Sequence, residues 1–419
     1  MQGLRGVQGA LGVPPPIHEP MFSLAERDRR WARLRELMGD ADVELLIVLP
    51  ESITSDSLYI ADTAGVTIFP REGDPVLILG GPQSDFAAEQ PQWVEDRVSA
   101  TKGGSSAVEY GRVTAELLRA RGLVGRRTAV SGLSGDALSS VRQPDGYALH
   151  TTVRRIAEAV GPEHVVDGTP LLGLARYVKG DEEVTRLAAS VRVGEAAAAA
   201  MAETARVGMS QAEVFGQMLL AQVRAGADAL QVAWVPGAWG ATRHRYVTTP
   251  PGLLTPGTHV STELMPEIRG YQAQVAQPMV IGKPTARAAE VFARNAVAFD
   301  AALAAFRPGA RWGDVIAAVD AAVGTTDGRM FPLMHGRGLG NDGPLFVPGL
   351  DETHVPEQPI LPNTTFVLKP FLQLPEAPSA FAYQYDVTWG DTIVVTHDGA
   401  RRLGTREREL TVIDDEKER

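Results

Sequence analysis

The chain has 419 residues, which is long for one hydrophobic core and favours two domains. Its hydrophobic share of 44% and charged share of 22% are ordinary for a globular protein. A net charge of −11 disfavours nucleic acid and anionic membranes as partners. The absence of cysteine excludes disulfides, thiol catalysis and cysteine-bound zinc, and is in keeping with a cytoplasmic location.

The first segment, residues 1–20, is rich in Gly and Pro and has no sustained apolar run. We expect it to be a flexible arm and not a signal peptide. No apolar run elsewhere is long enough to span a bilayer.

Residues 21–170 alternate between helical and strand patterns, and none of these segments has the spacing of a catalytic motif. Such alternation predicts a small α/β domain. The expected elements are a helix over Ser23–Met38, a strand over Val43–Leu49, a hairpin of Val66–Phe69 and Val76–Leu79, a helix over Val113–Arg121 and a strand at Thr128–Val130.

Residues 171–419 contain an internal duplication. Pro256–Glu263 aligns with Pro362–Lys369, so that Glu263 falls opposite Lys369. Each copy follows a helical region that begins with a similar Gly, acidic residue and Val spacing, at Val207–Val214 and Pro308–Val315. We therefore predict two αβ halves related by a pseudo-twofold axis, with any shared site close to that axis.

The first duplicated strand continues into a second one. The pattern predicts a strand that ends near Pro266, a tight link at Arg269-Gly270, and another strand that closes at Gly282.

An ordered series of short motifs resembles the pita-bread family of aminopeptidase P, prolidase, methionine aminopeptidase and creatinase. The series includes Arg176, Lys179 and Glu183 as RxxKxxxE, the glycine-rich segment His335–Gly340 and the segment Gly390–Val395. The resemblance implies an α/β (α+β) fold. A creatinase/prolidase-like domain would occupy residues 21–170, and a pita-bread domain with pseudo-twofold symmetry would occupy residues 171–419.

The chain departs from this family at the metal ligands. Family metallopeptidases hold two metal ions with two Asp, one His and two Glu, which suit divalent cations. The corresponding residues here are Glu263, Gln274, Leu339, Lys369 and Gly390. Because one acidic ligand remains, the resemblance implies a site without metal or other cofactor, for which creatinase is the family's precedent.

Four residues are candidates for catalysis. The resemblance places His244 and His335 beside a substrate, where imidazoles suit proton transfer near neutral pH. Glu263 and Lys369 would meet near the axis, so that the ammonium replaces metal charge and polarises a carbonyl while the carboxylate accepts a proton. The alternative is a structural ion pair in a dead site.

Four further residues are candidates for substrate binding. Arg337 could bind a carboxylate as a fork. Tyr271 matches a Gly-Tyr pair of the family that is often structural, Asp391 follows the lost glutamate at Gly390, and Tyr385 lies a few residues before it.

The sequence as a whole favours a metal-independent, creatinase-like hydrolase that acts on a small amide, amidine, amino-acid or imino-acid substrate. Elimination, isomerisation and cyclisation would use the same residues. The alternatives are a non-catalytic peptide- or protein-binding module and an Xaa-Pro metallopeptidase. The resemblance also implies a homodimer in which one chain lines its partner's pocket.

Overall fold

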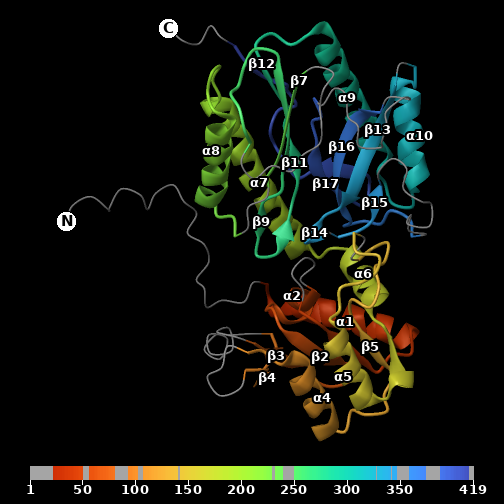
Figure 1. The fold of residues 1–419 in the computed structure, drawn as a ribbon. Coiled ribbons are helices and arrows are strands. Elements are labelled where there is room, and N and C mark those ends of the chain that lie inside the picture. The colour runs from red at the N-terminus through yellow and green to blue at the C-terminus, as the bar shows by residue number, and fades with distance from the viewer. Residues whose placement is uncertain are drawn as a thin grey trace, which may run out of the picture. The chain divides into compact units, whose positions relative to one another are not determined.

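A computed structural model of the chain divides into two compact units. The first contains the described residues within 22–177 and the short segment 339–344, and the second contains those within 178–338 and 345–414 (Figure 1). The division therefore follows Tyr177, whereas the sequence suggested residue 170. The described residues are 22–50, 56–80, 93–101, 107–139, 142–228, 232–238, 250–326, 328–340, 342–346, 358–373 and 387–414.

The first unit is built on one six-stranded sheet with the order β4-β3-β2-β1-β5-β6. The predicted hairpin is confirmed as antiparallel β2 and β3, and β1 pairs in parallel with β5. The strands are β1 (Leu45–Val48), β2 (Val66–Pro70), β3 (Val76–Leu79), β4 (Asp96–Ser99), β5 (Thr128–Val130) and β6 (Val165–Asp167).

Helices of this unit bury apolar residues from the sheet. Leu45, Ile47, Ile68 and Ile78 of the strands share one core cluster with Leu118 and other helical residues. The helices are α1 (Leu24–Asp40), α2 (Asp56–Ala61), α4 (Tyr110–Ala120), α5 (His150–Val160), the 3₁₀ helix η1 (Pro162–His164) and α6 (Thr169–Tyr177).

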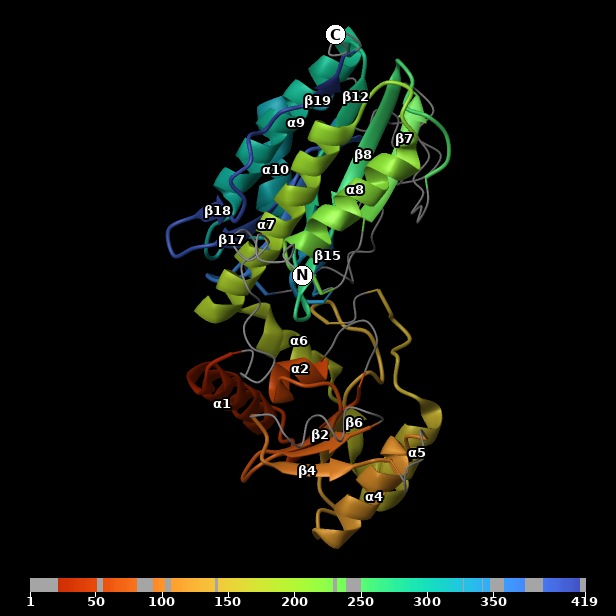
Figure 2. The same cartoon turned by 90° about the vertical axis from the view of Figure 1, so that its left-hand side faces the viewer.

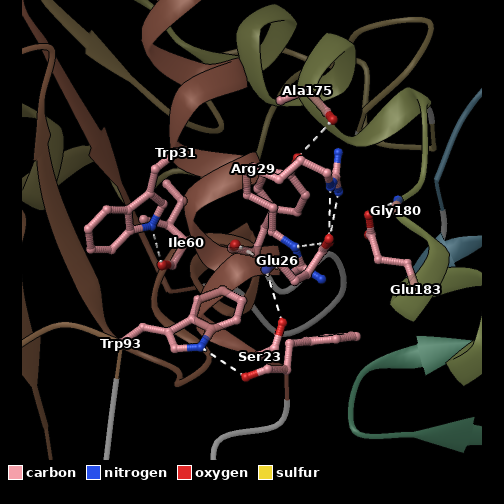
Figure 3. A network of polar contacts seen from close by, with 12 residues as sticks. Ser23, Glu26, Arg29, Trp31, Ile60, Trp93, Ala175, Gly180 and Glu183 are labelled. Carbon is pink, nitrogen blue, oxygen red and sulfur yellow. Dashed lines mark hydrogen bonds and ion pairs between the residues drawn. The ribbon is translucent and has the colours of Figure 1, made fainter.

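The start of α1 is held by a polar and aromatic network (Figure 3). The Ser23 hydroxyl accepts a hydrogen bond of 3.1 Å from the Glu26 backbone, which caps the helix predicted from its periodicity. Glu26 also accepts from the fully buried Arg30 at 2.8 Å, and the Arg30 guanidinium lies 4.3 Å from the centre of the Phe22 ring. The buried cation is thus matched by a carboxylate and by aromatic faces.

The second unit consists of two halves, and each half has a pair of helices followed by a sheet. The helix pairs lie on opposite sides of the strands (Figure 1), and Figure 2 shows α7 and α8 crossing in front of the strands. The helices are α7 (Asp181–Thr204), α8 (Gln211–Arg224), α9 (Ala286–Ala305) and α10 (Trp312–Val323). None of the helices in the described ranges is long and apolar enough to cross a membrane.

The sheet of the first half has the order β11-β8-β12-β19, with β7 also paired to β8. The short strands β9 and β10 pair with each other. The bounds are β7 (Val232–Ala238), β8 (Thr258–Leu264), β9 (Glu267–Ile268), β10 (Tyr271–Gln272), β11 (Val275–Ala276), β12 (Met279–Ile281) and β19 (Thr411–Ile413).

The sheet of the second half has the order β15-β13-β16-β17-β18. A single antiparallel bridge between Ala276 and Gly390 joins it to the first sheet. The bounds are β13 (Arg329–Gly336), β15 (Leu345–Phe346), β16 (Thr365–Gln373), β17 (Asp391–Val395) and β18 (Ala400–Arg402). The short strand β14 (Gly338–Leu339) belongs to the same small sheet as β9 and β10.

The predicted strand from Gly270 to Gly282 is wrong as one continuous element. The structure divides it into β10, β11 and β12, because β11 pairs with the end of β8 near Glu263 and β12 pairs with its beginning near His259. Pro278 lies between β11 and β12, where it supplies no backbone donor. The tight link is confirmed, since Arg269 and Gly270 both have positive φ, at 48° and 82°.

Candidate functional site

The two duplicated strands, β8 and β16, bring Glu263 and Lys369 together. The Lys369 ammonium donates a hydrogen bond to Glu263 Oε1, and the two side chains are 7% and 15% exposed, respectively. The duplication and the family resemblance predicted that both residues approach the pseudo-twofold axis, where they could pair. An ion pair with so little exposure to water has lost most of its hydration, so each charge depends strongly on the other.

His335 lies on the same sheet face as Lys369. On β13, Leu333 pairs with Lys369 and His335 pairs with Val367, and side chains two residues apart on a strand share a face. The His335 ring is buried, with Nδ1 3.1 Å from the Gly336 carbonyl oxygen and Nε2 3.4 Å from Arg337 Nη2. The imidazole and the ammonium are therefore diagonal neighbours on a rigid sheet.

The Arg337 guanidinium is buried and binds two amide side chains of the other half. Its Nη1 donates to Gln272 Oε1 at 2.7 Å, and its Nη2 donates to Gln274 Oε1. Sequence reasoning proposed Arg337 as a fork for a carboxylate, with a solvent-facing arginine as the alternative. The structure contradicts the solvent-facing alternative, because Arg337 is buried and links the β10–β11 region to His335, and contact with a carboxylate stays a prediction.

The backbone of Gln274 is fixed by β17. Its N–H donates to Thr392 Oγ1 at 2.9 Å, and the same hydroxyl donates to the Gln274 carbonyl at 2.8 Å. Sequence reasoning treated Gln274 only as a lost metal ligand and did not consider Gln272. Their alternate positions before β11 were the signal that both side chains belong to one face.

Gly390 allows β17 to approach Lys369 closely. A Cβ built on Gly390 would lie 2.5 Å from Lys369 Cβ and 2.7 Å from the Leu368 carbonyl oxygen. Neither atom belongs to the flexible end of a side chain, so any larger residue would push the strands apart. The close approach of β17 to β16 at this point therefore requires glycine at position 390.

Tyr271 contacts a helix through its hydroxyl. The fully buried Tyr271 donates to Glu183 Oε1 on α7 at 2.7 Å, and its carbonyl accepts from Ser190 at 2.8 Å. Glu183 also accepts from the Gly180 backbone at 2.7 Å and so caps α7; both residues are labelled in Figure 3. These contacts give Glu183 and Tyr271, which match motifs of the family, a structural role in holding α7. Contact of Tyr271 with a ligand stays a prediction.

Asp391 lies on the opposite face of the sheet from Lys369, because it pairs with Leu368 across β16 and β17. Its Oδ2 accepts from Arg402 at 2.8 Å. Burial raises the pKa of the Asp391 carboxyl, although the nearby Arg406 and Arg402 oppose the shift. Contact of Asp391 with substrate stays a prediction, and its present contacts hold the β17–β18 corner.

The arginines beside Asp391 stack on an aromatic ring. The Arg406 and Arg402 guanidinium groups lie 4.2 Å and 4.7 Å from the centre of the Trp389 ring. Burial lowers the pKa of the Arg406 guanidinium, which keeps its charge at neutral pH.

Two polar residues of β8 were missed by the sequence reasoning. His259 and Ser261 alternate with Glu263 along the strand, so all three share one face, and the first two are also buried. Burial lowers the pKa of the His259 imidazole. Strict alternation in His-Val-Ser-Thr-Glu was the signal that would have revealed them.

Two candidates cannot be placed. His244 and Tyr385 lie outside the described residues. Their predicted roles remain predictions.

The donor set at the five family ligand positions does not suit a dinuclear metal site. Leu339 and Gly390 have no ligating side-chain atom, and Glu263 Oε1 and Gln274 Oε1 accept from Lys369 and Arg337, respectively. Within the described ranges there is no group of three or more His, Cys, Asp and Glu side chains arranged to hold a metal ion. The cations of Lys369 and Arg337 thus contact Glu263 and Gln274, the two residues at these positions that could still supply an oxygen ligand to a metal.

Solved structures with the same fold include two peptidases. The dipeptidase PepE from Mycobacterium ulcerans has a TM-score of 0.69 and 22% identity, over 94% of this chain and 99% of that one. The X-Pro aminopeptidase from Thermotoga maritima has a TM-score of 0.70 and 17% identity, over 91% and 99% of the two chains. The predicted α/β pita-bread fold is confirmed.

Sequence comparison gives the family. A curated relative, the uncharacterized hydrolase/peptidase y4tL from Sinorhizobium fredii, is 22% identical over 316 residues, which are 72% of this chain and 77% of that protein. The family model described as metallopeptidase family M24 matches residues 185–397, about half of the chain and most of the second unit. The chain therefore belongs to the metallopeptidase family M24 and is a pita-bread protein.

Proposed function

We propose that this protein is a metal-independent hydrolase that cleaves a C–N bond in a small amide, amidine, amino-acid or imino-acid substrate. The observation that carries the proposal is the ion pair between Glu263 and Lys369, at positions where family metallopeptidases have metal ligands. A buried ammonium supplies positive charge in the place where a metal would otherwise polarise the substrate.

The proposed reaction uses general acid–base chemistry. In an amide substrate, Lys369 donates a hydrogen bond to the carbonyl oxygen, which becomes negative as a water oxygen attacks the carbonyl carbon. Glu263 accepts the proton of that water. The C–N bond then breaks, and His244 gives a proton to the leaving nitrogen while His335 hydrogen-bonds the substrate.

The surroundings of the pair favour catalysis over a dead site. His335 shares the sheet face of Lys369, and Arg337 approaches the same imidazole at 3.4 Å. Acidic, basic and titratable groups are thus held on packed strands, as precise catalysis requires. Elimination, isomerisation and cyclisation use the same groups and differ in which bond breaks.

We also propose a homodimer in the cytoplasm, with no cofactor. The homodimer follows from the family resemblance, and the location is proposed from the lack of cysteine in the chain.

The metal requirement tests this function. Protein purified without chelator is analysed for Mn, Fe, Co and Zn, and is assayed on creatine, glycylproline and N-acetylproline with product detection by mass spectrometry. We expect no stoichiometric metal, and turnover of one substrate that is unaffected by EDTA. About two equivalents of metal per chain, or turnover that requires added metal, contradicts metal independence.

The second test concerns His244. His244→Ala is expected to lower turnover by about 10² to 10⁴-fold, as is typical for a general acid or base. A variant within a few-fold of the wild type would remove His244 from the mechanism.

A further inference from the structure

Gln274 presents an oriented, buried donor in the candidate site. Its side chain is fully buried, and its Oε1 accepts a hydrogen bond from Arg337. Because a guanidinium only donates, the oxygen of this amide must face Arg337 and the NH₂ group must face away from it. Among the residues that the structure describes, Gln274 Nε2 has no hydrogen-bond partner.

Buried donors without a partner are a minority in folded proteins, although the described part of this chain has others, such as Gln222 Nε2 and Trp389 Nε1. Most buried polar side-chain atoms have a partner, and an orphaned donor destabilises the fold. Gln274 cannot relieve this cost by turning its amide, since the turn would bring NH₂ against the Arg337 cation. Its backbone is also held, through two hydrogen bonds with the Thr392 hydroxyl.

The position of Gln274 links it to the catalytic candidates. Ala276 pairs directly with Glu263 between β11 and β8, and Gln274 lies two residues before Ala276, at the entry to β11. Through Arg337 it is also one contact away from His335. The unpartnered donor therefore lies among the groups that would surround a ligand.

A neighbouring glutamine supplies the contrast. Gln272 Oε1 accepts from the same guanidinium at 2.7 Å, and Gln272 is also buried. Its amide nitrogen, however, is not among the buried orphan atoms of the described residues. Holding Arg337 in place therefore does not by itself require an unsatisfied amide donor.

We propose that Gln274 Nε2 is the donor that binds a carbonyl or carboxylate oxygen of the ligand. It would fix that oxygen next to the Glu263–Lys369 pair, as amide side chains do when they stabilise a developing oxyanion. The assignment rests on the proposed function only for the choice of a small amide or amino acid as the ligand. It explains why the residue is a glutamine, since a carboxylate would hold Arg337 more strongly but would have no donor.

The test compares two substitutions of the same charge. Gln274→Glu keeps the size of the side chain, forms an ion pair with Arg337 and removes the donor. Gln272→Glu makes the same charge change next to the same guanidinium without removing an orphaned donor. Binding of L-proline, as a carboxylate probe, and of N-acetyl-L-prolinamide, as a neutral carbonyl probe, is measured by titration calorimetry together with thermal melts.

We expect Gln274→Glu to melt no lower than the wild type, and to bind the neutral probe about ten-fold more weakly. Gln272→Glu should weaken that binding by less than about three-fold. Gln274→Met, which removes the donor without adding charge, should lose affinity to a similar extent as Gln274→Glu. If Gln274→Glu does not fold, Gln274→Met alone measures the loss of the donor.

Three results would overturn the assignment. If Gln274→Glu and Gln274→Met bind the neutral probe as well as the wild type, water or protein satisfies the donor. If Gln274→Glu and Gln272→Glu lose affinity equally, the loss is caused by the negative charge added near Arg337 and not by the missing donor. If the wild type binds neither probe, the ligand class is wrong. Probe binding that depends on Gln274 in a protein without turnover would instead contradict the proposed reaction and leave this assignment intact.

Discussion

The charge on single residues decides most of the chemistry that we propose. Glu263 and Lys369 form a pair with little exposure to water, and Arg337 is buried against neutral amides of Gln272 and Gln274. A buried pair of this kind contributes little net stability, because desolvation offsets the attraction, but loss of one partner leaves a costly charge. Substitutions that remove one charge or both should therefore differ sharply.

Lys369→Met is expected to destabilise the protein by about 3–5 kcal/mol, because Glu263 would stay buried without its cation. The double variant Glu263→Gln/Lys369→Met should recover most of this loss, since no buried charge remains. Thermal melts of the wild type, both single variants and the double variant measure the coupling. Additive single effects would mean that the pair is not a coupled unit.

A pH effect is expected from His259, whose pKa is lowered from 6.5 by burial. The unfolded chain then binds a proton more readily than the folded chain, so stability falls as the pH drops from 6.5 toward the lower folded pKa. The melting temperature of His259→Asn should fall less steeply than that of the wild type as the pH drops through this acid range. Above pH 7.5, roughly one unit above the ordinary pKa, the melting temperatures of the two proteins should change with pH in parallel. If the melting temperatures of the variant and the wild type change equally with pH below 6.5, proton binding by His259 is not coupled to folding.

At the scale of elements, the contact between β16 and β17 depends on a missing side chain. The Ala276–Gly390 bridge joins the two sheets, and the space beside Gly390 is taken by the backbone and Cβ of β16. None of these β16 atoms belongs to the flexible end of a side chain, so none can move aside for a larger residue at position 390. The strands β11, β16 and β17 therefore set the distance between Gln274 and Lys369 as one assembly.

Gly390→Ala is expected to destabilise the protein by about 1–3 kcal/mol, since the new methyl group would lie 2.5 Å from Lys369 Cβ. Gly216→Ala is the matched control. Gly216 is exposed within α8 and has no atom within 4 Å of an added Cβ, so this change should stabilise the helix by roughly 0.5–1 kcal/mol. The prediction fails if the two variants have the same melting temperature.

At the scale of the whole molecule, the remaining expectation concerns assembly. Exposed apolar residues occur on helices of the second unit, including Leu220 and Val223 on α8 and Val297 on α9. Single exposed residues of this kind are normal and do not define an interface. The dimer is therefore argued from the family resemblance alone.

We expect light scattering to give a mass of about twice the 44.8 kDa of one chain at concentrations where ligand binding is retained. A dilution series provides the control, because a dimer that completes the site should lose binding as it dissociates. A monomer with full binding would contradict the assembly.

The sequence alone determined many of the elements, through local pattern, and the equivalence of Glu263 and Lys369, through the duplication. Periodicity located α1, turn signals located β8, and the duplication located β16. The duplication predicted that Glu263 and Lys369 would meet, since equivalent strands of two related halves face one axis. Together with the ordered motifs, these features were sufficient for the fold.

Only the tertiary structure decided which other residues join that pair. The faces of Tyr271 and Asp391 follow from strand register and from packing on α7 and β18, and a shift of one residue would reverse them. The contact of Arg337 with Gln272 and Gln274 joins strands more than 60 residues apart and has no local signature. Likewise, the closeness of Gly390 to Lys369 and the orphaned donor of Gln274 are properties of packing, which a single sequence does not display.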